Sequence, residues 1–268
     1  MGHLFQTSIL PGGLPGERPA GSQASGIVIG EEQHPSAGGE APSRPSVTVS
    51  YAQTLDGRVA TRTGESKWIS CSDSLRFAHE MRASHDAVLV GAGTVCKDDP
   101  RLTVRHVPGT SPLRVVVDST LRTPPNAAVL ADGAAQGTVF AVTDRAPEER
   151  LEKAYSLGAT IMKLPSSLDG RVDLAALLGE LVASGIGSVM VEGGATLVTG
   201  FFRARLVDRI AVCVAPKILG EGIEAIGDLG IRDLSRSLTL ADVAVEPYGV
   251  DLILSGRIEY PDGVPDRG

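Results

Sequence analysis

Short apolar runs rich in β-branched residues alternate with helical stretches along most of the chain, and this alternation limits the possible folds more than any other feature. Strands that alternate with helices form a mainly parallel sheet with helices on both faces. We therefore predict an α/β fold of three layers. The strand candidates are 47–51, 87–90, 113–117, 139–142 and 188–191, and the helix candidates are 72–83, 147–157, 174–184 and 195–204.

The last part of the chain breaks this pattern. The strand candidates 209–215 and 250–259 have no full helix between them. Parallel neighbours usually need a helical crossover, whereas antiparallel neighbours do not. We therefore predict an antiparallel C-terminal edge on a mostly parallel sheet.

The two ends of the chain differ in composition from the middle. Of the 35 residues from 11 to 45, 8 are Gly and 6 are Pro, and only 27–29 offers a run of core-forming side chains. Such a segment cannot bury enough apolar surface to offset the entropy that it loses on ordering. We predict a disordered tail over 1–44, one folded domain over 45–261 and a frayed end over 262–268.

Charge and composition exclude several classes of function. The chain has 25 Lys and Arg against 32 Asp and Glu, a net charge of −7, which disfavours nucleic acid as a partner. No apolar stretch approaches the ~20 residues of a membrane span and no secretory signal is recognisable, so we expect a cytoplasmic protein without membrane contact. The three cysteines and five histidines show no metal-ligand spacing, so we expect neither a disulfide framework nor a metal site.

Polar and glycine-rich segments follow four of the predicted strands. Ligands bind outside the carboxyl ends of the strands in an open α/β sheet, so these segments together predict one binding crevice. The Glu192-Gly193-Gly194 turn opens the last predicted helix, where free backbone N–H groups suit a phosphate and glycine allows its close approach. The four segments are 52–58, 91–94 with 97–102, 118–119 and 192–196.

Each of these segments also has a purely structural explanation. Gly91 to Thr94 contains GxG but not GxGxxG, and a tight turn would account for it. Asp98 and Asp99 precede Pro100, which is typical of an acidic turn. Glu192-Gly193-Gly194 could likewise be a simple turn.

Arg82 has two readings as well. It follows Leu75 and Ala78 on one side of its predicted helix, at the edge of the apolar stripe, where an arginine can either line a site or reach the surface. Three further residues are more typical of packing than of chemistry, namely Trp68, His79 and His85.

Taken together, the segments resemble the pyrimidine reductase family of riboflavin biosynthesis, the RibD-type C-terminal reductase domain. The similarity runs from about residue 45 to 259. The motifs that carry it are VTVSYAQTLDGRVA, GESKWIS, HDAVLVGAGTVCKDDPRLTVR, VMVEGGATLVTGFF and LVDRIAVCVAPKILG, in this order.

The resemblance implies a dihydrofolate-reductase-like fold and a homodimer. It also implies NADPH-dependent reduction of a ribosylamino-pyrimidine 5′-phosphate to its ribitylamino product, with hydride delivered to C1′ of the ring-opened sugar. No metal is implied. For the phosphate that distinguishes NADPH from NADH, the sequence offers Ser119, Arg122 and the backbone N–H groups beyond Gly194.

Carried over position by position, the resemblance assigns one set of residues to the cofactor and another to the substrate. The cofactor set is Ala52, Trp68, Thr94, Asp98 and Ser119, with Gly194, Ala195, Thr196, Leu197 and Gly200 in the segment that holds the phosphates. The substrate set is Ser66, Arg82, Leu102, Arg105 and Glu192.

The residue types suit these roles. Arg82 and Arg105 can form forked hydrogen bonds to a 5′-phosphate. Glu192 can accept hydrogen bonds from sugar hydroxyls or pyrimidine N–H groups. Asp98 is placed nearest the reacting end, as an orienting group or proton relay, and is the one expected catalytic residue.

The chain departs from the bifunctional members in two respects. It lacks the H-x-E and P-C-x-x-C motifs of their zinc deaminase domain, so we expect a stand-alone reductase with a separate deaminase elsewhere in the pathway. Ser50 replaces a lysine of many bacterial members, and Tyr51-Ala52-Gln53 is closer to fungal reductases, whereas Trp68 resembles the bacterial form. Both the uracil and the 2,5-diamino-pyrimidinone substrates therefore stay open.

Two rival functions also fit the sequence. The same fold could reduce a folate-like or secondary-metabolite substrate, or the chain could be an inactive nucleotide-binding regulator. The paired arginines favour a phosphorylated substrate over the first alternative, and the polar groups on the substrate side would be unnecessary for the second.

Overall fold

The computed structural model describes residues 42–67, 69–131 and 133–261. Trp68, the tail over 1–41 and the end over 262–268 lie outside the described residues. Within them, the central sheet has the strand order β10-β11-β8-β1-β7-β3-β4-β5-β6. The strands are β1 (Ser46–Thr54), β3 (Ala87–Gly91), β4 (Leu113–Val117), β5 (Thr138–Val142), β6 (Thr160–Lys163), β7 (Ser188–Glu192), β8 (Arg209–Ala215), β10 (Thr239–Tyr248) and β11 (Asp251–Glu259).

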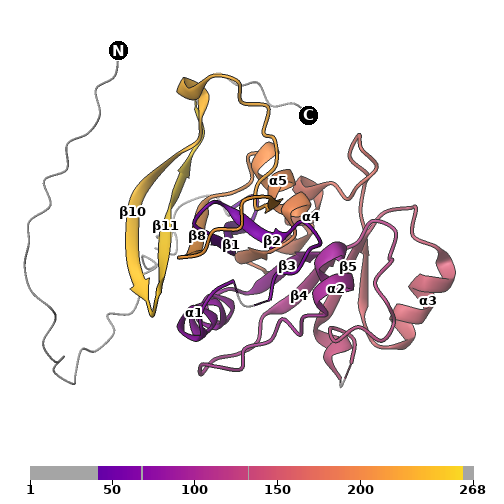
Figure 1. The fold of residues 1–268 in the computed structure, drawn as a ribbon. Coiled ribbons are helices and arrows are strands. Elements are labelled where there is room, and N and C mark those ends of the chain that lie inside the picture. The colour runs from indigo at the N-terminus through magenta and orange to yellow at the C-terminus, as the bar shows by residue number, and fades with distance from the viewer. Residues whose placement is uncertain (1–41, 68, 132, 262–268) are drawn as a thin grey trace, which may run out of the picture. The chain divides into compact units, whose positions relative to one another are not determined.

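The sheet has the predicted mixture of directions. From β8 to β6 in this spatial order, each strand runs parallel to the next. β11 pairs antiparallel with β8, and β10 pairs antiparallel with β11, which together form a hairpin at one end of the sheet (Figure 1). The prediction of an α/β fold with an antiparallel C-terminal edge is thus confirmed.

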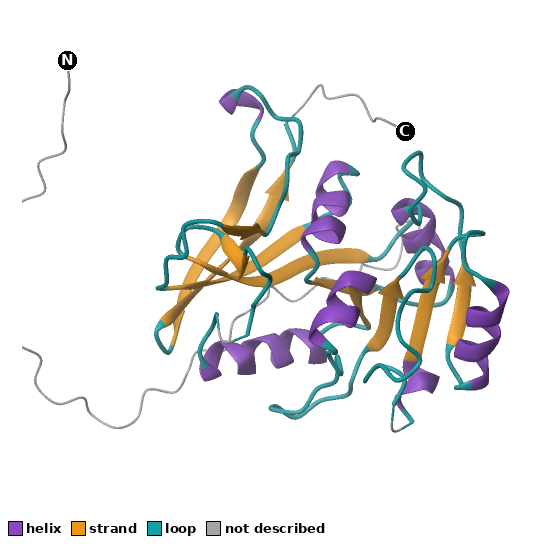
Figure 2. Cartoon of the chain, turned by 45° about the vertical axis from the view of Figure 1, so that its right-hand side comes forward, coloured by secondary structure: helices purple, strands orange, loops and turns teal. Residues whose placement is uncertain are grey.

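Helices cover both faces of the sheet, as Figure 2 shows. α4 (Leu174–Ala183) and α5 (Ala195–Arg203) pack on one face, against a core that includes Val47, Val49 and Val191. The other face carries α3 (Glu148–Ser156), which packs on β5 and β6, and α1 (Ser72–Ala83) near the hairpin. The alternation of strand side chains sends successive residues to the two layers.

α1 has the predicted bounds but a different buried face. Ser74, Phe77 and Met81 are buried, whereas Leu75, expected on the apolar stripe, is 40% exposed. The hairpin explains the rotation, because Phe77 packs against the ring of Tyr248 with centroids 5.3 Å apart. Ser74 Oγ also donates to the buried carboxylate of Asp251 at 2.7 Å, and the Cys71 N–H donates to the same oxygen at 2.7 Å.

The segment after β3 is a helix rather than the turn considered from its glycines. α2 (Ala92–Asp98) begins directly after Gly91, and the next residue after it, Asp99, adopts a left-handed conformation with φ of 44°. Asp99 Oδ1 accepts the N–H of Ala128 at 2.7 Å. Of the two neighbouring acids, Asp99 therefore has the structural role, and Asp98 keeps its side chain available for the site.

A small second sheet lies beside the central one. β2 (Arg58–Thr61) pairs antiparallel with β9 (Gly222–Glu224). Asp56, in the turn before β2, accepts the N–H groups of Leu219 and Gly220. Hydrogen bonding from Thr54 and these N–H groups lowers the pKa of the Asp56 carboxyl to about 2.

The residues just before β1 are tied to the folded domain. Arg44 forms a two-point ion pair with Asp208, with both N–O distances 2.7 Å, and Asp208 also accepts the N–H of Val47 at 2.8 Å. In the described part of the chain, no helix is long and apolar enough to cross a membrane.

Candidate functional site

A cleft of about 3310 Å³ opens at the carboxyl ends of the central strands. This volume is several times that of a pocket for one small ligand, so it has room for a dinucleotide and a second substrate. Every described residue of the predicted set lines it, which confirms that the four segments meet. Those residues are Ala52, Ser66, Arg82, Thr94, Asp98, Leu102, Arg105, Ser119, Glu192, Gly194, Ala195, Thr196, Leu197 and Gly200.

The glycine turn before α5 forms one wall of the cleft. Gly193 and Gly194 have φ of 76° and 85°, which other residues rarely adopt. A Cβ atom on Gly194 would lie 3.1 Å from Thr94 Oγ1 on the neighbouring helix α2. The turn is therefore both conformationally restricted to glycine and closely packed against α2.

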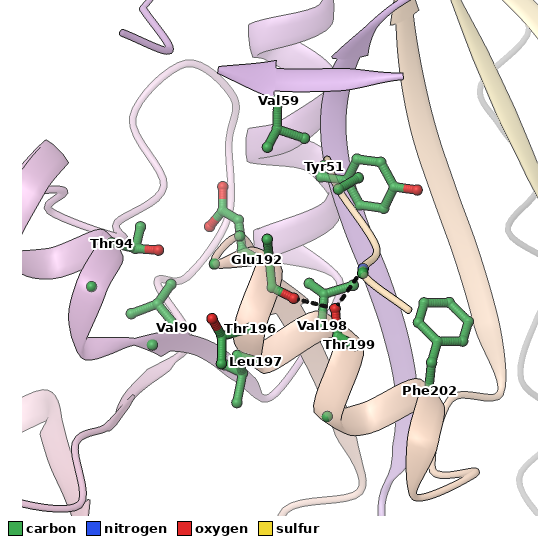
Figure 3. Close-up of a pocket in the computed structure, with 18 of the residues that line it drawn as sticks. Tyr51, Val59, Val90, Thr94, Glu192, Thr196, Leu197, Val198, Thr199 and Phe202 are labelled. Atoms are coloured by element: carbon green, nitrogen blue, oxygen red, sulfur yellow. Dashed lines mark hydrogen bonds between the residues drawn. The ribbon is translucent and has the colours of Figure 1, made fainter. Parts of the chain in front are cut away.

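The start of α5 presents backbone donors to the cleft. The first N–H groups of a helix have no acceptor within the helix, and the helix dipole adds positive potential there. Figure 3 shows Thr94, Glu192 and Thr196 from three different elements around the same cavity. Thr199 Oγ1 donates to the carbonyl of Ala195 at 2.6 Å and accepts the N–H of Gly227 at 2.8 Å, which ties this turn to the loop after β9 (Figure 3).

Three members of the predicted cofactor set also have structural roles. Leu197 is buried in the core, and Gly200 faces α4, because a Cβ atom on it would lie 3.3 Å from Leu174. Ser119 Oγ accepts the N–H of Val172 at 3.1 Å. The exposed Thr196 hydroxyl and the Gly194–Ala195 backbone thus offer hydrogen-bonding groups to the cleft, whereas the apolar Leu197 side chain offers none.

Asp98 lies at the exposed C-terminal end of α2. Its carboxylate accepts a hydrogen bond from Ser66 Oγ at 3.3 Å. This contact joins an expected catalytic residue to an expected substrate residue, although they are far apart in the sequence. Lys97, the residue before Asp98, contacts the same loop, because its ammonium lies over Gly64.

Arg82 reaches the opposite wall from the last turn of α1. It is 8% exposed, so it is not a surface arginine. Its guanidinium forms a two-point ion pair with Glu192 at the end of β7, through Nε to Oε2 at 2.9 Å and through Nη2 to Oε1. Its Nη1 donates to the carbonyl of Thr103 at 3.3 Å. Three of its five N–H groups are therefore engaged.

Arg105 lies beside Arg82 and has a freer side chain. Its Nη1 donates to Thr103 Oγ1 at 2.8 Å, and the residue is exposed. Partial burial, together with the charges of Arg82 and Arg101, lowers the pKa of the Arg105 guanidinium. A concentration of positive charge that depresses an arginine pKa is a site where an anion is stabilised.

Leu102 closes this wall from the inside. It is 1% exposed and has φ of 56°, an unfavourable conformation for a leucine. Strained residues of this kind concentrate at functional sites, where the surrounding structure holds them. Asp98 and Arg105, on either side of Leu102 in the sequence, both line the cleft.

One neighbour of the arginines carries no functional signal in the sequence. His79, for which the sequence favours packing, is fully buried, but its Nδ1 accepts the N–H of Arg105 at 3.1 Å. It lies three residues before Arg82 in the helix, which is the only sequence signal that could have placed it near the site.

The comparison with known families decides the assignment. A family model described as the RibD C-terminal domain matches residues 45–254. The chain belongs to this family. The predicted resemblance to the RibD-type reductase domain is therefore confirmed.

Relatives of the RibD C-terminal domain family include both long and short proteins. The riboflavin biosynthesis protein RibD of Aquifex aeolicus is 42% identical over 212 residues, which are 79% of this chain and 57% of the relative. The 2,5-diamino-6-ribosylamino-4(3H)-pyrimidinone 5′-phosphate reductase of Methanothermobacter thermautotrophicus is 42% identical over 220 residues, which are 77% of this chain and 99% of the relative. The chain thus spans just over half of the RibD relative and almost all of the reductase.

A solved structure of the family has the same architecture. RibD of Acinetobacter baumannii superposes with a TM-score of 0.70 at 28% identity, over 81% of this chain and 59% of the other. The fold predicted from the RibD-type motifs is thereby confirmed.

Proposed function

We propose that the chain is an NADPH-dependent reductase of riboflavin biosynthesis that converts a ribosylamino-pyrimidine 5′-phosphate to its ribitylamino product. One observation carries the proposal: a glycine turn at a helix N-terminus and a pair of arginines face the same cleft, with Asp98 and Glu192 lining it too. The glycine turn suits the phosphates of a dinucleotide, and the pair of arginines suits the phosphate of a sugar phosphate.

The glycine turn fits a nicotinamide dinucleotide. The backbone at Gly193 and Gly194 carries no side chain to block the start of α5, and the N–H groups there suit a pyrophosphate. Thr94 and Thr196 add hydroxyl groups on either side of this turn. NADPH, when bound, supplies the hydride that reduces C1′ of the sugar.

The choice of NADPH over NADH rests on Arg122. Its Nη2 lies 3.5 Å from where a Cβ atom on Gly93 would stand, in the wall of the cleft. Among the described residues, no acceptor is bonded to this guanidinium, so its hydrogen-bonding capacity is available for the extra phosphate of NADPH.

Arg105 is the main anchor that we propose for the substrate phosphate. Arg82 donates most of its N–H groups to Glu192 and Thr103. Its role is therefore to add positive charge to the phosphate site and to hold Glu192 in place. Glu192 can then accept from the sugar or the pyrimidine with its remaining lone pairs. Ser66 and Leu102 shape the pocket between these groups.

Asp98 is the side chain proposed to orient the reacting end or relay a proton. Two other candidates in the cleft are poorly suited to proton transfer at neutral pH, because burial raises the pKa of Tyr51 to about 12 and that of Cys213 to about 12. The carboxylate of Asp98 is exposed to the cleft and accepts a hydrogen bond from Ser66 Oγ at 3.3 Å.

We further propose a homodimer that forms through the β10–β11 hairpin. Val245 and Leu252 are 55% and 48% exposed. Val245 is paired with Leu254, and Leu252 is paired with Pro247, so that all four side chains lie on one face of the hairpin. An apolar face at a sheet edge needs cover.

The test is a reaction of purified protein with NADPH and each pyrimidine phosphate, the uracil and the 2,5-diamino form, followed by mass spectrometry. Reduction adds two hydrogen atoms to the substrate that is used. A product from either form supports the proposal and identifies the pyrimidine. Absence of a product from both, with dihydrofolate reduced instead, would replace it with the folate-like alternative.

A further inference from the structure

His79 lies beneath the two arginines and contacts the chain between them. Its side chain is 0% exposed, and its ring meets the ring of His106 edge-on with centroids 4.5 Å apart. Its Nδ1 accepts the backbone N–H of Arg105 at 3.1 Å. A backbone hydrogen bond at this residue fixes the position from which the Arg105 side chain departs.

The hydrogen bond determines the chemical form of the ring. Since Nδ1 of His79 accepts, a neutral ring carries its proton on Nε2. That Nε2 is buried and has no hydrogen-bond partner among the described residues. An unsatisfied buried donor destabilises a protein, so a leucine or methionine would be the better choice if this position served packing alone.

The surroundings keep the ring neutral. Burial, followed by the charges of Arg82 and Arg105 and by His106, lowers the pKa of His79 to about 4. These are the charged and titratable groups that face it, on α1 itself and on the loop packed against α1. At neutral pH the ring is therefore an acceptor, and it adds no charge to the arginine cluster.

Thr103 completes the arrangement from the other side. Its carbonyl accepts from Arg82 at 3.3 Å and its hydroxyl accepts from Arg105 at 2.8 Å. The segment 103–105 is thus held by Arg82 at one end and by His79 at the other. Both anchors come from α1, one turn of the helix apart.

We propose that His79 is a positioning residue, which holds the Arg105 backbone so that the guanidinium meets the substrate phosphate. The inference rests on the proposed function, because it takes Arg105 as the phosphate anchor. It extends that function by adding a residue that touches neither substrate nor cofactor but sets the geometry of one contact. A small displacement of a binding group can cost a large factor in rate or affinity.

Two substitutions test this. His79→Leu removes the acceptor and fills the space, whereas His79→Asn places an amide oxygen near the Nδ1 position and can still accept from Arg105. We expect His79→Leu to raise the Michaelis constant for the phosphorylated pyrimidine by about tenfold or more, with the Michaelis constant for NADPH unchanged. We expect His79→Asn to restore most of the loss.

The dephosphorylated substrate separates positioning from a general packing effect. Wild type and His79→Leu should turn over the ribosylamino-pyrimidine without its 5′-phosphate equally well, because Arg105 then has nothing to bind. Equal losses with both substrates, or no rescue by asparagine, would overturn the proposal. His79→Gln, whose amide reaches the Nε2 rather than the Nδ1 position, replaces the leucine variant if that variant does not fold.

Binding measurements keep the inference distinct from the proposed function. If the wild type reduces neither pyrimidine, the reductase proposal fails, but ribose 5-phosphate can still be titrated by calorimetry. Weaker binding to His79→Leu than to wild type and His79→Asn supports the positioning role, and equal binding to all three contradicts it. The matched control is His85→Asn. His85 is a partly buried histidine just after α1, and its Nδ1 contacts the carbonyl of Met81 rather than the Arg105 backbone. This substitution should leave the binding of ribose 5-phosphate unchanged.

Discussion

Arg82 and Glu192 join the last turn of α1 to the end of β7 through two hydrogen bonds between one guanidinium and one carboxylate. Their side chains are 10% and 20% exposed, so solvent screens the pair only in part. The ion pair connects the helix that carries His79 with the strand that leads into the glycine turn. The two halves of the cleft are therefore mechanically coupled at this point.

Replacing Glu192 by glutamine should loosen this connection. The amide keeps the shape but leaves the Arg82 charge without its partner, so we expect the free energy of unfolding to fall by about 1–3 kcal/mol. The Michaelis constant for the pyrimidine should rise as well. Denaturant unfolding and steady-state kinetics measure both effects. Glu80→Gln, which alters an exposed pair with Arg76, is the control and should leave both nearly unchanged.

The neighbouring acids Asp98 and Asp99 should respond in opposite ways. If Asp98 relays a proton, Asp98→Asn should lower kcat by roughly 100-fold with little change in either Michaelis constant. Asp99→Ala loses the bond to the Ala128 N–H and should lower stability by about 1–2 kcal/mol while turnover is spared. Thermal unfolding beside stopped-flow NADPH oxidation checks the pair. A stability loss in Asp98→Asn with normal turnover would mean that Asp98 is structural too.

Arg122→Ala should change the choice of cofactor. One charge-assisted contact to the extra phosphate contributes about 1.5–3 kcal/mol, so the Michaelis constant for NADPH should rise by roughly 10- to 100-fold. The constant for NADH should stay the same, because NADH lacks that phosphate. Arg145→Ala serves as the control, since that guanidinium is bound to the Gly170 carbonyl outside the cleft. A loss that is equal for the two cofactors would contradict the assignment.

The hairpin predicts the oligomeric state. Light scattering should give a mass near twice the 27.8 kDa of one chain. Leu252→Glu places a charge on the exposed apolar face of the hairpin and should shift the mass to that of the monomer. The control is Leu168→Glu, because Leu168 is 99% exposed and lies between β6 and α4, outside the hairpin. This variant should remain a dimer. A wild-type mass of one chain at micromolar concentration would rule out the dimer.

The buried histidine predicts a pH dependence of stability. The pKa of His79 is about 4 in the folded protein against an ordinary value of 6.5, so between these values the unfolded chain binds more protons. Stability should therefore decrease as pH falls from 6.5 towards 4, with no further contribution from this group below 4. Urea unfolding at several pH values across this window measures the slope, and His79→Asn should flatten it. An unchanged slope in the variant would assign the dependence to other groups.

Much of the fold follows from local sequence, and the exceptions have identifiable causes. Five strands of the parallel part of the sheet, namely β1, β3, β4, β5 and β7, and the bounds of α1 follow from runs of apolar and β-branched residues. β10 was not predicted because most of its side chains are exposed, so its sequence lacks a buried stripe. For α2 a tight turn is an equal alternative from the sequence, because Gly91 and Gly93 lie close together, whereas in the structure Gly91 only precedes the helix and Val95 anchors it to the core.

The site was predictable as a set of residues but not as a set of contacts. Every described residue that the strand-end rule and the family motifs assign to the site lines the cleft. They could not show that Arg82 is paired with Glu192, because the partner lies 110 positions away. They also could not reveal His79, since a histidine that bonds to a backbone N–H leaves no pattern in the sequence.

The place of β1 in the sheet has a consequence for how the protein is made. β1 is flanked by β7 and β8, and its register joins Ser46 to Ser188 and Thr48 to Arg209. On the ribosome this strand emerges well before β7 and β8, because both of them come more than 130 residues later in the chain. Until then Val47 and Val49, which are fully buried in the finished protein, have no partners, and contacts between such distant segments form slowly. The nascent chain therefore passes through a stage in which an unpaired apolar strand is open to aggregation or to a chaperone, and the cleft cannot form before that stage ends.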